Sequence, residues 1–196
     1  MNTLTQQLLQ QLAGGAVSQI GQKIGADDQS TNSALTAAVP LLVSALAKNA
    51  ADPAGAKALH KAVAKDHDGS ILDDLEGFLG NPEAANGSGI LTHVLGSQQT
   101  AVTRGLTQQT GLSSDQVAQL LQIAAPLVMG MLGKQQRQQS LSTKGLTGLL
   151  GQEKQQAEQS NPDLMGTLNT LLDMNNDGSA LDDIMGLAGK LLGGNK

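Results

Sequence analysis

Residues 17–48 read VSQIGQKIGADDQSTNSALTAAVPLLVSALAK, and residues 103–134 read TRGLTQQTGLSSDQVAQLLQIAAPLVMGMLGK. The two stretches align without gaps at an interval of 86 residues, which places Pro40 opposite Pro126. Each stretch has apolar residues at helical spacing, a glycine turn and then a longer apolar run that contains the proline. Similarity over this length predicts a chain built from two related helical units.

The repeat predicts a first unit over residues 1–98 and a second over 99–196, with a Gln-rich insertion near 135–160 in the second. Pro40 and Pro126 each lack a backbone N–H, so we expect the long helix of each unit to kink or restart there. The units are short and their central helices are apolar nearly all round. We therefore expect both units to share one aliphatic core.

The composition favours an all-α fold with many short helices. Phe78 is the one aromatic residue, and the apolar content is otherwise mostly Leu and Ala, which are strong helix formers. The 24 glycines are unfavourable inside helices, so they are expected at helix ends and at close helix contacts. A net charge of −5 disfavours binding to nucleic acid or to an anionic membrane.

A second repeat consists of two acidic turns that lead into helices. Residues 65–80 read KDHDGSILDDLEGFLG and residues 174–189 read MNNDGSALDDIMGLAG, which share D-G-S-x-L-D-D. The shared part has the spacing of a helix cap, with Ser70 three residues before Asp73 in the first turn. Capping therefore explains the shared half of the motif without any ligand.

The second turn also has residues that suit calcium. Its candidate ligands, in the order of a calcium loop, are Asp173, Asn175, Asp177, the carbonyl of Ser179, and Asp183. Ile184 occupies the place of the usual bidentate Glu, so Asp183 can act only if the loop is one residue shorter. The first turn fits less well because Ala64 stands at its first ligand position. Calcium binding and simple capping both remain open for the second turn.

The pattern of a short helix, a glycine turn, a Ser/Ala-rich stretch and a Pro-Leu helix resembles the bacterial YidB-like family of domains of unknown function. The GILTHVLG segment at 89–96 and the D-G-S-x-L-D-D turns are similar to longer members of that family. The resemblance implies an all-helical fold with a homeodomain-like arrangement of helices. It implies no activity.

The segment LTQQTGLSSDQVAQL, residues 106–120, has the spacing of a helix-turn-helix. Its would-be reading helix exposes Asp115, Gln116 and Gln119 and no Lys or Arg to contact phosphates. Nucleic-acid binding is therefore the alternative rather than the preferred function.

No catalytic motif is evident, and the histidines (His60, His67 and His93) stand in unrelated contexts. The sequence thus favours a non-enzymatic helical interaction or scaffolding protein, with calcium as its candidate regulator. Its partner would be another protein or a second copy of the chain.

The location expected from the sequence is the cytoplasm. The N-terminus lacks the features of a signal peptide, and the longest apolar runs are shorter than the roughly 20 residues that cross a bilayer. The absence of cysteine fits a reducing compartment.

Overall fold

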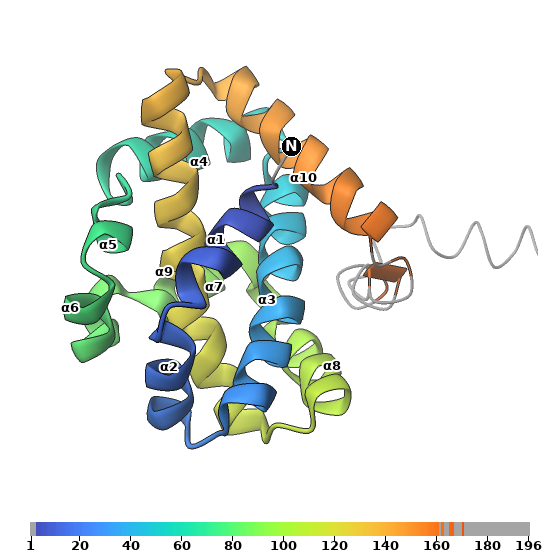
Figure 1. Cartoon of the computed structure of the whole chain (residues 1–196). Helices are drawn as coiled ribbons and strands as arrows, with labels where there is room; N and C mark the ends of the chain where they lie inside the picture. Colours follow the sequence, from blue (N-terminus) through green and yellow to red (C-terminus); the bar gives the residue numbers. More distant parts are fainter. Residues whose placement is uncertain (1–2, 161, 163–164, 167–169, 171–196) are drawn as a thin grey trace, which may run out of the picture.

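The computed structural model describes residues 3–160 together with residues 162, 165, 166 and 170. Within these residues the regular structure is entirely helical, so the prediction of an all-α fold is confirmed. The elements are α1 (Leu4–Leu12), α2 (Ala16–Ile24), α3 (Asp28–Asn49), α4 (Pro53–Lys65), α5 (Ser70–Asp73), α6 (Leu75–Gly80), η1 (Pro82–Ala85), α7 (Gly87–Leu95), η2 (Gly96–Gln98), α8 (Gln99–Thr110), α9 (Ser114–Gln139) and α10 (Thr143–Ser160). The Gln-rich stretch near 135–160 forms the last residues of α9 and the whole of α10 (Figure 1).

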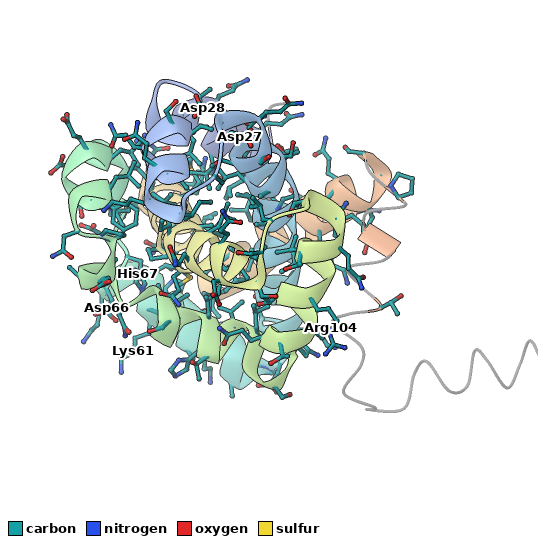
Figure 2. All side chains as sticks on the ribbon, turned by 90° about the horizontal axis from the view of Figure 1, so that it is seen from below. Asp27, Asp28, Lys61, Asp66, His67 and Arg104 are labelled. Atoms are coloured by element: carbon teal, nitrogen blue, oxygen red, sulfur yellow. The ribbon has the colours of Figure 1, made fainter. Side chains whose placement is uncertain are left out.

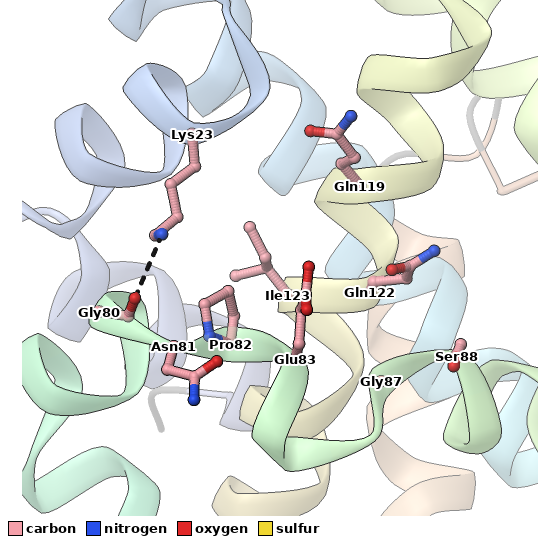
Figure 3. A pocket seen from close by; sticks show the side chains of 10 residues that line it. All are labelled: Lys23, Gly80, Asn81, Pro82, Glu83, Gly87, Ser88, Gln119, Gln122 and Ile123. Atoms are coloured by element: carbon pink, nitrogen blue, oxygen red, sulfur yellow. Dashed lines mark hydrogen bonds between the residues drawn. The ribbon is translucent and has the colours of Figure 1, made fainter.

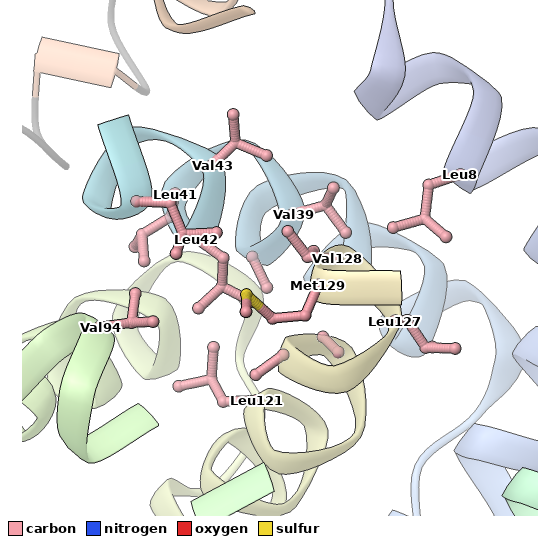
Figure 4. Packing of buried hydrophobic residues seen from close by; sticks show 14 of the residues in the cluster. Leu8, Val39, Leu41, Leu42, Val43, Val94, Leu121, Leu127, Val128 and Met129 are labelled. Atoms are coloured by element: carbon pink, nitrogen blue, oxygen red, sulfur yellow. The ribbon is translucent and has the colours of Figure 1, made fainter. Parts of the chain in front are cut away.

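The two long helices, α3 and α9, pack against each other at the centre of the molecule (Figure 1). Every residue of 37–46 in α3 and of 123–133 in α9 is buried. Their side chains form one aliphatic cluster to which residues of both halves contribute, with Met129 among the valines and leucines of α3 and α9 (Figure 4). The expected shared core is therefore present.

The helix that follows each central helix in the chain packs against the other central helix. α4 follows α3 in the chain but packs on α9, and α10 follows α9 but packs on α3. α1, α2 and α8 each contact both central helices. Beyond α10, Met165 is 1% exposed and lines a small groove with Leu9 and Pro40. The two halves thus cover each other rather than forming separate cores.

The turns before α3 and α9 have the same local geometry. Gly25 ends α2 with φ +69°, and Gly111 ends α8 with φ +74°, a backbone region that glycine adopts at little cost. The side chain of Asp27 accepts the N–H of Ser30, and that of Ser113 accepts the N–H of Gln116. Each of these features recurs 86 residues later. The homeodomain-like arrangement of helices stays a prediction.

The helices do not restart at the prolines: α3 and α9 continue through Pro40 and Pro126. A proline leaves the carbonyl four residues earlier without its helical N–H, which here frees the carbonyl of Gln122 in α9. Gly87, the first residue of α7, lies so close that a Cβ on it would sit 1.9 Å from that carbonyl oxygen. The freed carbonyl therefore marks the place where α7 approaches α9.

α3 and α9 are also long and apolar enough, by length and composition alone, to cross a membrane. Their uninterrupted apolar runs are shorter than the helices that contain them. In the folded chain 72% of the most apolar stretch of α3 and 78% of that of α9 are buried inside the protein. A core helix of a soluble protein has the same properties.

Candidate functional site

The first acidic turn connects α4 to α5 and is built around Gly69, whose φ is +96°. Ser70 does not cap this helix with its side chain, so the predicted cap of Ser70 and Asp73 is wrong. Instead the carboxylate of Asp68 accepts the N–H of Ser70 at 3.0 Å, and Asp74 accepts the N–H of Gly77 at 2.9 Å to cap α6.

This turn is docked on a glycine-bearing face of α9. A Cβ on Gly133 would lie 1.7 Å from the carbonyl oxygen of His67, and one on Gly69 would lie 2.8 Å from Cβ of Lys134. Real Cβ atoms do not approach that closely, so the contact requires glycine on both sides. The side chain of Ile71 covers Gly130, one turn earlier in α9. In the first copy the D-G-S sequence thus serves to pack the turn closely against α9.

The acids of the first turn face the basic residues of α9. Asp68 lies 3.3 Å from Arg137, and Asp73 lies 3.3 Å from Lys134. Both pairs are partly exposed and so contribute little to stability individually. The N–H of Ser70 and then its hydroxyl, with a smaller effect of Arg137, lower the pKa of Asp68 below its ordinary value. The first turn therefore holds its carboxylates in a cap and in ion pairs.

His67 lies in the same turn and is half-buried. Burial lowers its pKa, and the charge of Asp66 opposes that shift. His60 contacts the carbonyl of Leu141 at 3.0 Å, and His93 contacts that of Gly89 in its own helix at 2.8 Å. Within the part of the chain that the structure describes, no three His, Asp or Glu side chains gather in a way that could hold a metal.

The predicted calcium ligands of the second turn (Asp173, Asn175, Asp177, Ser179 and Asp183) lie outside the described residues. Calcium binding there stays a prediction.

The helix-turn-helix element of residues 106–120 meets its equivalent 86 residues earlier, residues 20–34, at one end of the molecule. The side-chain amide of Gln116 donates to the carbonyl of Gly25 at 2.7 Å, and its oxygen accepts the N–H of Ser113 at 2.9 Å. Gln116 is therefore engaged in packing and capping rather than held free to read a base. Asp27 and Asp28 lie together at the start of α3 (Figure 2), which places negative charge where a phosphate would have to approach.

A polar cleft lies between α2, η1, the start of α7 and α9, and the sequence analysis did not identify it. Its volume is about 610 Å³, and its lining includes Lys23, Asn81, Pro82, Glu83, Gly87, Ser88, Gln119, Gln122 and Ile123 (Figure 3). Because these residues come from four separate elements, no local motif announces them. One signal is present in the sequence: Gln119, Gln122 and Ile123 are spaced by three and four residues, which places them on one side of a helix.

Comparison with known proteins identifies one family. The family model of a bacterial protein of unknown function, DUF937, matches residues 6–135. No curated protein and no solved structure matches the chain. The matched residues extend from α1 almost to the end of α9, and thus span both central helices. The chain belongs to the DUF937 family of bacterial proteins of unknown function.

Proposed function

We propose that this chain is a non-enzymatic helical interaction protein whose second acidic turn, residues 173–183, responds to calcium. The observation that carries the proposal is a difference between the faces of α3 and α9. Where α9 has Gly130 and Gly133, the positions 86 residues earlier in α3 are Ser44 and Ala47. A turn docked as closely as the first would clash with their Cβ atoms.

The face of α3 is also already covered. Residues 37–46 are buried, and α10 packs along α3. We therefore infer ion binding, rather than packing against α3, as the role of the acids of the second turn. Asp173, Asn175 and Asp177 alternate as calcium ligands do. The first turn has Asp66 and Asp68 at the second and third of these positions but Ala64 at the first, and its Asp68 and Asp73 pair with Arg137 and Lys134.

Native mass spectrometry of the full chain with calcium or with chelator tests this proposal. We expect one calcium ion per chain, lost in Asp177→Ala because a central ligand is removed. Asp68→Ala, the matched change in the first turn, should retain the ion. The same spectra report whether copies of the chain associate.

An unchanged mass in calcium contradicts the proposal. Loss of the ion in Asp68→Ala but not in Asp177→Ala would also contradict it, because that result places the site in the first turn.

The alternative, a regulator that contacts nucleic acid, gains no support from the end where the helix-turn-helix elements meet, since Asp27, Asp28 and Asp115 all lie there. We further propose a cytoplasmic location, on the grounds of the cysteine-free sequence.

A further inference from the structure

We propose that the polar cleft between α2, η1, α7 and α9 binds an extended peptide segment of a partner protein, one that carries an acidic and a basic side chain. The inference makes the interaction role above concrete at a different site, and it holds whether or not the second acidic turn binds calcium. The cleft volume of about 610 Å³ falls in the range of ligand sites, ~300–1,000 Å³.

The hydrogen-bonding groups of the cleft suit a peptide backbone. Asn81, Gln119 and Gln122 each present a carboxamide, which both donates and accepts. Within the described structure these three side-chain amides have no protein partner, and neither do the backbone N–H groups of Gly87 and Ser88 at the start of α7. A peptide backbone alternates N–H and C=O groups and can use donors and acceptors of both kinds.

The charges of the cleft determine which peptide fits best. Lys23 reaches only the carbonyl of Gly80, at 3.5 Å, which is long for a hydrogen bond. Glu83 stands on η1 in the same cleft, and it forms no ion pair with Lys23. Figure 3 shows the side chain of Lys23 directed to Gly80 and the side chain of Glu83 on η1. Ile123, which is 4% exposed, also lines the cleft. Because Lys23 and Glu83 form no ion pair, a peptide with an acidic side chain for Lys23 and a basic side chain for Glu83 suits the cleft best.

The same features disfavour other ligands. Single-stranded nucleic acid is bound by stacking on aromatic rings along a basic groove, whereas this cleft has no aromatic residue and has one cation beside one anion. A largely apolar ligand would find only Ile123 and Pro82 as apolar side chains. A polar, extended and mixed-charge chain uses every group that the cleft presents.

The test is an NMR titration of the full-length protein with a capped hexapeptide that has one Asp and one Lys separated by two alanines. We expect shifts confined to the side-chain amides of Asn81, Gln119 and Gln122 and the backbone amides of Gly87 and Ser88. Replacing the peptide's Asp and Lys by Asn and Gln should weaken binding about tenfold. Gln122→Leu should weaken it about three- to tenfold, because one amide pair is lost.

Gln152→Leu is the matched control, since Gln152 is an exposed glutamine on α10, outside the cleft. The double change Lys23→Glu with Glu83→Lys should restore binding only to a peptide with Asp and Lys exchanged. The proposal is overturned if no shifts occur, if they are spread over the surface, or if Gln152→Leu weakens binding as much as Gln122→Leu. Binding of free lysine or aspartate in place of the peptide also overturns it.

Discussion

The two central helices have the same frame and different outer faces. α3 and α9 both begin after a left-handed glycine, both have a side-chain cap, and both continue through a buried proline. Yet α9 has Gly130 and Gly133 where α3 has Ser44 and Ala47. The acidic turn of residues 66–70 lies on the glycines of α9, while α10 lies along α3.

This difference shows that the presence or absence of one or two Cβ atoms on a helix face determines which element can pack against it. The D-G-S turn brings backbone carbonyls against α9, which only a face without Cβ atoms can accept. A helix such as α10 packs through side chains at a greater distance and accepts Ala and Ser. Two related helices can therefore be covered by unlike elements without any change in the caps or turns that position them.

The largest expected effect comes from exchanging the small residues of the two faces. Gly133→Ala places a Cβ 1.7 Å from the carbonyl oxygen of His67, and the backbone on both sides must move. We expect the free energy of unfolding to fall by about 3 kcal/mol. The matched change Ala47→Gly removes a methyl group from α3 and should cost about 1 kcal/mol, mostly helix propensity. Urea unfolding measures both.

If Gly133→Ala costs no more than Ala47→Gly, the close contact of the turn with α9 does not exist and the comparison fails.

An intermediate effect is expected at Ser44. Its hydroxyl is buried and has no hydrogen-bond partner among the described residues. Ser44→Ala removes an unsatisfied polar group and improves helix propensity, so unfolding should become harder by about 1 kcal/mol. Urea unfolding again provides the measurement, and Ser33→Ala, an exposed position of the same helix, serves as its control. A destabilised Ser44→Ala protein would show that the hydroxyl has a partner.

The smallest effect concerns the acid sensitivity of the docked turn. Burial lowers the pKa of His67 from 6.5, so the unfolded chain takes up this proton more readily and folding is penalised as the pH falls through about 6.5. His67→Asn should flatten the stability profile between about pH 7.5 and 5.

The pKa of Asp68 is also lowered, and its contribution is present above about pH 4 and lost below it. Asp68→Asn should therefore alter only the more acidic part of the pH–stability profile.

Thermal unfolding in a series of buffers measures both profiles. A His67→Asn protein with the same pH–stability profile as the wild type contradicts the role given to His67.

Much of the fold follows from local sequence. Gly25 and Gly111 predicted the turns, and the apolar periodicity predicted the helices on either side of them. The expected restart at the prolines is wrong, because a buried helix that is held on all sides can lose one backbone hydrogen bond and still continue. A kink at the prolines stays a prediction. The cap at Ser70 was mistaken for a similar reason. Local spacing fits Ser70 and Asp73, but the docking of Gly69 on α9 leaves Asp68 in the better position.

The candidate site was harder to predict than the fold. The cleft joins Lys23, Glu83 and Gln122, which are far apart in the sequence and ordinary as surface residues. Their meeting depends on the way α7 starts against the freed carbonyl in α9. No pattern in one sequence expresses that dependence, because it arises from tertiary packing.

The crossed cover of the central helices has a consequence for synthesis on the ribosome. α3 ends at Asn49, but α10, which covers it, does not begin until Thr143. At ~5–20 residues per second the intervening chain takes about 5 to 20 seconds to make. During that time one of the most apolar segments of the nascent chain has not yet met its covering helix. We therefore expect the nascent N-terminal half to expose apolar surface of α3 until α10 has been synthesised.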